Sequence, residues 1–154
     1  MAKEIETYEG MLVFEATTSH TFNDATRYTS WRDNKPPYAV RIPDRRAAIK
    51  AGAFYEDDDL GAIIMPDSVR MIGRMAFYDC DKLTKVALSA SLRVIGASAF
   101  EDCDELAEIR IPDSVTVIEA KAFSGCDNLK EIHIKNADLL KGQDLEEDVR
   151  IIQD

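Results

Sequence analysis

Apolar residues along the chain recur in columns whose members are spaced by 23 residues. A phenylalanine, a leucine and an isoleucine return at this interval, and an aliphatic residue returns in a fourth column. The members are Phe54, Phe77, Phe100 and Phe123; Leu60, Leu83, Leu106 and Leu129; Ile49, Ile72, Ile95 and Ile118; and Val40, Ile63, Val86, Ile109 and Ile132. Because self-similarity at a fixed period of about 20–50 residues marks a repeat architecture, the sequence predicts a stack of similar coils.

Within one repeat, apolar and polar residues alternate in a way that is typical of a short strand. The segment "LAEIRI" at 106–111 places Ile109 and Ile111 on one face and charged residues on the other. Pro112 then turns the chain, since proline cannot continue a paired strand. "VTVI" at 115–118 predicts a second extended piece, and "AKAFSGC" at 120–126 predicts a helical or tight turn that directs Phe123 inward. A single repeat has too little apolar surface to fold alone, so stacking must bury the columns.

The pattern divides the chain into three parts. Residues 37–135 hold one partial and four full repeats, the predicted solenoid. Residues 1–36 are expected to form an N-terminal cap, with a strand at "GMLVFEA" (10–16) and a hairpin as one arrangement. Residues 136–154 are apolar enough to form a C-terminal cap, and the sequence leaves open whether this tail is a helix or a strand. Such caps are needed because a stack exposes its last core layer.

Two units show the repeat most fully: "RVIGASAFEDCDELAEIRIPDSV" from Arg93 and "TVIEAKAFSGCDNLKEIHIKNAD" from Thr116. This pattern resembles the BspA-like class of leucine-rich repeat over roughly residues 37–135. The resemblance implies an α/β leucine-rich-repeat solenoid with one short strand per repeat in a curved sheet. It also implies adhesion or host-protein binding at a bacterial surface. The sequence departs from the pattern at Asp57, which stands in the cysteine column, and at Ser89 and Lys135, which stand in the proline column.

Charge and hydropathy exclude several classes of partner. The 154-residue chain carries a formal net charge of −10, which opposes binding to nucleic acid or to an anionic membrane. No apolar run approaches the roughly 20 residues that span a bilayer, so membrane insertion is not expected. The first residues lack the pattern of a secretory leader. The expected location is therefore the cytoplasm for the sequence as written, or the cell surface if a leader was removed.

Candidate chemistry is sparse. Cys80, Cys103 and Cys126 occupy one repeat column, where a cysteine packs as a small buried hydrophobe, and zinc-type clusters are missing. The column Asp58, Asp81, Asp104 and Asp127 could cap local turns or, less favourably, hold calcium. No "GxSxG" or phosphate-binding loop is present, and only His20 and His133 could act as bases. We therefore expect no enzyme, no cofactor and no metal site.

The outward face of the predicted sheet is the expected recognition surface, as in other solenoids. One outward column runs Ala39, Ala62, Lys85, Glu108 and Glu131, and the next runs Arg41, Ile64, Ala87, Arg110 and His133. Mixed charge of this kind suits a protein or peptide partner. The residues expected to bind are Trp31, Tyr38, Arg41, Ile64, Lys85, Glu108, Arg110, Glu131 and His133. Trp31 could instead seal the end of the core, and a second copy of the chain is an alternative partner that would form a homodimer.

Overall fold

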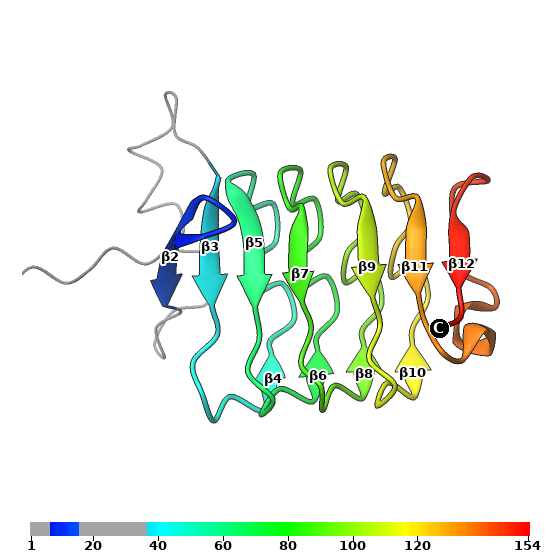
Figure 1. The fold of residues 1–154 in the computed structure, drawn as a ribbon, viewed down its shortest axis with the longest axis horizontal. Coiled ribbons are helices and arrows are strands. Elements are labelled where there is room, and N and C mark those ends of the chain that lie inside the picture. The colour runs from blue at the N-terminus through cyan, green and yellow to red at the C-terminus, as the bar shows by residue number, and fades with distance from the viewer. Residues whose placement is uncertain (1–6, 16–36) are drawn as a thin grey trace, which may run out of the picture.

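The structure is a computed structural model that describes residues 7–15 and 37–154. The described residues form a stack of coils in which a main row of strands faces the viewer and a shorter row lies behind and below it (Figure 1). The main row comprises β2 (Met11–Glu15), β3 (Tyr38–Arg41), β5 (Leu60–Ile64), β7 (Lys85–Ala87), β9 (Glu108–Arg110), β11 (Glu131–His133) and β12 (Arg150–Ile152). The second row comprises β4 (Ala48–Ile49), β6 (Met71–Ile72), β8 (Val94–Ile95) and β10 (Val117–Ile118).

Neighbouring coils pair their strands in parallel, and the register follows the repeat. In the main row Ile109 lies opposite Ile132, and in the second row Ile72 lies opposite Ile95. The main row consists of two hydrogen-bonded sheets, one ending at β7 and the other beginning at β9. The predicted solenoid and both of its extended pieces are therefore confirmed.

The α part of the expected α/β class is wrong, because the described residues form short strands and turns with almost no helix. Within the described ranges the one helix is η2 (Ala137–Leu140), a short 3-10 helix. The segment 120–126 is a tight turn, since Lys121 and Gly125 adopt positive φ angles of 59° and 68°, which interrupt any right-handed helix. Its backbone groups bond between coils instead, as where the Phe100 N–H donates to the Ala122 carbonyl at 2.8 Å.

The same two left-handed positions recur in every full repeat. The first column is Gly52, Met75, Ser98 and Lys121, and the second is Glu56, Asp79, Asp102 and Gly125. Since an L-residue in this region costs roughly 1–2 kcal/mol, the stack must stabilise a backbone that most of these side chains disfavour.

The phenylalanine column forms a continuous stack through the core. Neighbouring rings lie nearly parallel, with centroids 5.1, 5.1 and 5.6 Å apart along the series Phe54, Phe77, Phe100 and Phe123. Each ring is at most 1% exposed. Burying such a side chain stabilises the fold by roughly 1.5–3 kcal/mol, so the ladder is a principal source of stability.

The cysteine column supports the stack with hydrogen bonds as well as with packing. Each thiol donates to the phenylalanine carbonyl of the preceding coil, at Sγ–O distances of 3.1, 3.1 and 3.0 Å for Cys80, Cys103 and Cys126. All three thiols are free and buried. The role expected from the sequence, that of a small buried side chain, is the one observed. In the first repeat Asp57 takes this place, accepts a hydrogen bond from the Tyr38 hydroxyl, and has its pKa raised by burial.

The N-terminal strand folds as part of a hairpin over the main sheet. β1 (Thr7–Tyr8) pairs antiparallel with β2 through a two-residue turn, in which Glu9 and Gly10 have positive φ. β2 then pairs in parallel with β3. The hairpin residues Tyr8, Met11 and Val13 pack on Ala39 and Ala62, both of which are fully buried.

Gly61 shows how closely this hairpin approaches the sheet. A Cβ added there would lie 2.4 Å from the Met11 sulfur and 2.5 Å from the Pro37 Cβ, closer than real contacts allow. The small residues of β5 are therefore a docking place for the chain's own N-terminal hairpin.

The C-terminal tail closes the far end of the stack. Leu140 from η2 is buried, and Leu145 and Val149 pack against the core. β12 then pairs in parallel with β11, so this segment continues the main sheet after an interval shorter than a full repeat. No helix of the described residues is long and apolar enough to span a membrane.

Candidate functional site

The charged part of the main sheet lies on β9, β11 and β12. Glu131 lies opposite Glu108 on one side and opposite Arg150 on the other, so three charged residues form one column across the strands. The next column places His133 opposite Arg110. In-register parallel strands bring side chains of one column within reach of each other. The register thus gathers both signs of charge on one face.

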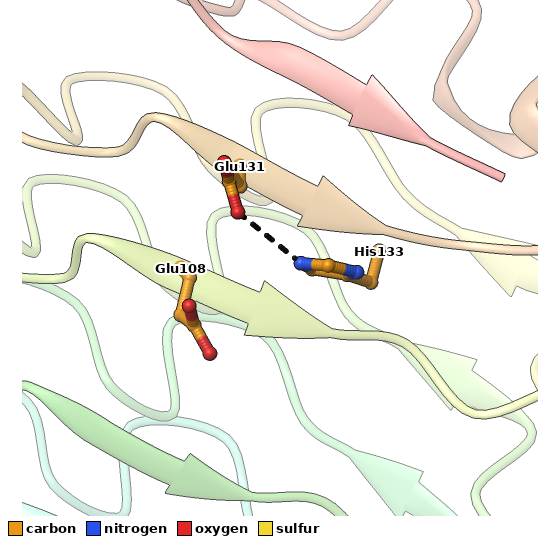
Figure 2. Close-up of side chains that lie close together, drawn as sticks. All are labelled: Glu108, Glu131 and His133. Atoms are coloured by element: carbon orange, nitrogen blue, oxygen red, sulfur yellow. Dashed lines mark ion pairs between the residues drawn. The ribbon is translucent and has the colours of Figure 1, made fainter. Parts of the chain in front are cut away.

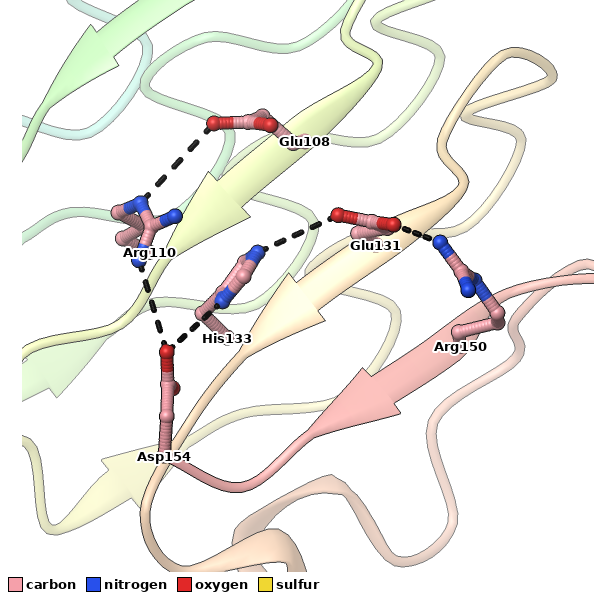
Figure 3. A network of polar contacts seen from close by, with 6 residues as sticks. All are labelled: Glu108, Arg110, Glu131, His133, Arg150 and Asp154. Atoms are coloured by element: carbon pink, nitrogen blue, oxygen red, sulfur yellow. Dashed lines mark hydrogen bonds and ion pairs between the residues drawn. The ribbon is translucent and has the colours of Figure 1, made fainter.

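These side chains and Asp154 form a network of polar contacts (Figure 3). Arg150 donates to Glu131, and the other oxygen of Glu131 lies 3.4 Å from His133 Nε2. His133 Nδ1 lies 3.3 Å from Asp154 Oδ2, which is 3.7 Å from the Arg110 guanidinium. Arg110 lies 4.0 Å from Glu108. The arginine pairs are solvent-exposed, and such pairs contribute at most about 1 kcal/mol each, so the network organises the surface more than it stabilises the fold.

His133 is the buried member of this network. Its side chain is 11% exposed, whereas that of Arg110 is 65% exposed. Nε2 is fully shielded from solvent and has no hydrogen-bond partner. A buried polar atom without such a partner lowers the stability of the folded state, so Nε2 is an unfavourable feature of this network.

The structure brings together four of the residues predicted from the sequence. Glu108, Arg110, Glu131 and His133 form the network, and Lys85 is exposed on β7. His133 lies on the predicted outward face, but Asp154 and Glu131 flank its ring and leave it buried. Arg150 and Asp154 were missed, since the tail leaves the 23-residue spacing that identified the other columns.

The other predicted residues lie away from the network. Tyr38 is half-buried against the core, and its hydroxyl is bonded to Asp57. Arg41 and Ile64 are half-buried on β3 and β5. Trp31 lies outside the described residues. The outward positions Ala39 and Ala62 do not offer an open apolar patch, because the hairpin covers them.

Acidic residues also cluster on the turns that precede the main strands. Burial, assisted by Asp81 and Asp102, raises the pKa of Asp79 to about 6. Burial and the neighbouring carboxylates Asp81 and Asp127 raise the pKa of Asp104. Lys82 offsets part of this charge through an ion pair with Asp59 at 3.4 Å. Whether the column Asp58, Asp81, Asp104 and Asp127 caps local turns or holds calcium stays a prediction.

Short parallel strands in register, one per 23-residue coil around a phenylalanine and leucine core, define a repeat solenoid of the leucine-rich-repeat class. The sequence model of the protein family described as BspA type leucine rich repeat region matches residues 39–142 in six copies. The chain belongs to this family.

Solved structures of bacterial leucine-rich-repeat proteins share the fold. A leucine rich cell surface protein from Faecalibacterium prausnitzii is 29% identical, with a TM-score of 0.66 over 78% of this chain and 32% of its own. A leucine-rich repeat protein from Bacteroides ovatus is 30% identical, with a TM-score of 0.68 over 73% of this chain and 29% of its own. A leucine-rich repeat protein from Bacteroides capillosus is 34% identical, with a TM-score of 0.57 over 61% of this chain and 74% of its own. This chain thus spans about a third of the first two proteins. No curated protein matches it.

Proposed function

We propose that the chain is a non-enzymatic protein-binding module whose partner docks on β7, β9, β11 and β12. The observation that carries this proposal is the exposed set of charged side chains along the main row of strands: Lys85 on β7, Glu108 and Arg110 on β9, and Arg150 on β12. The hairpin covers the other end of the same face, which leaves the charged end as the accessible part. Charges of both signs favour a partner with a complementary charge pattern.

The size of this surface limits the kind of complex. Strands about 4.8 Å apart, with a few outward residues each, offer on the order of 300–400 Å². A standard stable interface buries about 800 Å² per partner. We therefore expect weak binding or binding of a short peptide, unless further surface such as the segment with Trp31 takes part.

Adhesion or host-protein binding at a bacterial surface is the finer form of the proposal. The Faecalibacterium prausnitzii protein is described as a leucine rich cell surface protein, and this chain is similar to a third of it. That similarity supports a partner outside the cell, with this chain acting as one unit of a recognition surface.

The test compares two double variants that each remove two cations. Lys85→Ala with Arg110→Ala alters the charged face, whereas Arg93→Ala with Lys121→Ala alters the exposed residues near the second row of strands. The chain is immobilised, binders are captured from host extracellular proteins, and each binder is purified and titrated by calorimetry. We expect the face variant to lose about 1–3 kcal/mol of binding free energy and the control to lose none. Equal loss in both variants would exclude this face as the docking surface.

Self-association is the second candidate function, and one observation favours it. β12 is the last strand of its sheet in the described part of the chain, and Ile151 on this strand is exposed. An exposed edge strand is a template for pairing with another chain. Light scattering at several concentrations decides this point: a mass of 17.3 kDa excludes self-association, and twice that mass supports a homodimer.

A further inference from the structure

Three potential metal ligands converge on the charged face, at the centre of the network. A carboxylate oxygen of Glu108, one of Glu131 and an imidazole nitrogen of His133 all lie within 4.8 Å of one another. Figure 2 shows Glu108 and Glu131 on adjacent strands, with the ring of His133 directed toward the Glu131 carboxylate. The two strands pair in register at Glu108 and Glu131, so the backbone itself sets this convergence.

The hydrogen bonding of His133 leaves one nitrogen facing an acceptor. With Nδ1–H donating to Asp154, a neutral imidazole presents the lone pair of Nε2 toward Glu131 Oε2 at 3.4 Å. Two acceptors that face each other in a shielded place repel, and Nε2 has no hydrogen-bond partner. A cation between the nitrogen and the carboxylates removes this repulsion. The buried nitrogen is therefore an observation independent of the carboxylate cluster.

We propose that Glu108, Glu131 and His133 bind one divalent first-row transition metal ion, with Zn²⁺ as the best match. For three atoms within 4.8 Å of one another, a point exists no more than about 2.8 Å from each. Side-chain shifts of under about 1 Å would bring the ligands to the roughly 2.0–2.2 Å of zinc–nitrogen and zinc–carboxylate bonds. Glu108 is exposed and can make this adjustment.

The surrounding residues already form the outer shell that such a site needs. Asp154 holds His133 by Nδ1, which is the carboxylate–histidine arrangement that fixes a ligating imidazole. Arg150 binds the Glu131 oxygen that faces away from His133, and so orients the oxygen that would bind metal. Asp154 and Arg150 are thus positioning residues.

The donor set selects the ion. An imidazole nitrogen with two carboxylates suits zinc and its neighbours in the periodic table, whereas calcium and magnesium take oxygen ligands. Three protein ligands leave a coordination position for water or for a side chain of a bound partner.

The test titrates ZnCl2 into chelator-treated full-length chain by calorimetry, with far-UV circular dichroism to confirm that the fold is intact. We expect one zinc ion per chain. Glu108→Gln, in an exposed residue, should weaken binding about tenfold or more, and His133→Gln should remove it. Asp154→Asn should weaken binding about 10–100-fold, as removal of an outer-shell carboxylate does.

Matched controls separate this site from others. His20→Gln removes the chain's other histidine, and Glu105→Gln neutralises an exposed glutamate that is not one of the three ligands, so both should bind zinc as the wild type does. CaCl2 should give no heat that depends on His133. The alternative is a proton on Nε2 that forms an ion pair with Glu131 and needs no metal. Absence of saturable zinc binding by the folded chain, or binding that His133→Gln leaves unchanged, overturns the proposal in favour of this ion pair.

Discussion

Replacement of Phe100 by alanine tests whether the phenylalanine stack holds the coils together. Phe100 is fully buried, and its ring stacks on Phe77 at 5.1 Å and on Phe123 at 5.6 Å. A buried Phe→Ala change typically costs about 3–5 kcal/mol. We expect the upper part of this range, because the cavity opens between two rings that the strand register holds apart. Against a total stability of about 5–15 kcal/mol, this one change removes about a quarter of the stability or more.

Two comparison variants separate the contributions of ring stacking and of burial to the cost of Phe100→Ala. Phe123 has a single stacked phenylalanine, so Phe123→Ala should cost about 0.5–1.5 kcal/mol less than Phe100→Ala. Tyr55 stacks on Tyr78 at 5.0 Å but is 38% exposed, so Tyr55→Ala should cost no more than about 1.5 kcal/mol. The difference between the costs of Tyr55→Ala and Phe123→Ala then measures burial, since each change removes one stacked pair of rings.

The cost of each variant is measured by urea unfolding, which is monitored both by far-UV circular dichroism and by amide NMR signals. Both probes are needed because repeat proteins can unfold in parts, and only coincident transitions give a single free energy. If Phe100→Ala costs no more than Tyr55→Ala, the buried phenylalanine rings are not what holds the coils together, and the hydrogen bonds between the strands suffice.

Four further outcomes follow from particular residues. Burial and acidic neighbours raise the pKa of Asp79 from 3.8 to about 6. Between these pH values the folded state therefore binds more protons than the unfolded state, and the free energy of unfolding should fall as pH rises through about 4 to 6. Asp79→Asn should therefore raise the melting temperature more at pH 7 than at pH 4, and an equal rise at both values would contradict the cause. Lys121→Gly should raise the free energy of unfolding by about 0.5–1 kcal/mol in urea, because glycine relieves the left-handed strain at a smaller entropic cost; a decrease would contradict this. Burial raises the pKa values of all three thiols, that of Cys126 to about 12, so Ellman's reagent should label them only after unfolding, and rapid labelling of folded protein would contradict their burial. Trp31 precedes Phe54 by one repeat length, so Trp31→Ala should lower stability in urea and leave partner binding intact; lost binding with unchanged stability would make it an interface residue.

The core was predictable because the same environment recurs in every coil. Phenylalanine, leucine and cysteine columns follow from one constraint, burial against an identical neighbour, and the structure buries each of them. The turn conformation was harder to predict, because Met75, Ser98 and Lys121 are not residues that indicate positive φ. A signal was present, because Gly52 stands in the column of these three residues and Gly125 stands in the second positive-φ column. The glycine in each column therefore favours the tight turn over the helical one, the two alternatives that the sequence left open.

The site was less predictable, because its burial depends on a segment that breaks the period. The repeat placed Glu108, Arg110, Glu131 and His133 on one face, as observed. It gave no position for β12, which follows β11 after η2 and brings Arg150 and Asp154 beside the charged columns. The environment of His133 is therefore a property of the end of the stack, and no other histidine stands in its column.

The two ends of the main sheet differ because different segments meet them. At one end, Ala39, Gly61 and Ala62 are small enough for Met11 to pack directly on the sheet, and their burial removes that surface from recognition. At the other end, β12 adds charged groups to the face and shields a single imidazole. A stack of similar coils thus acquires a distinct surface at one end. Because the flanking segments cover one end of the sheet and add charged groups at the other, both the proposed partner and the proposed metal ion are expected to bind at β9, β11 and β12.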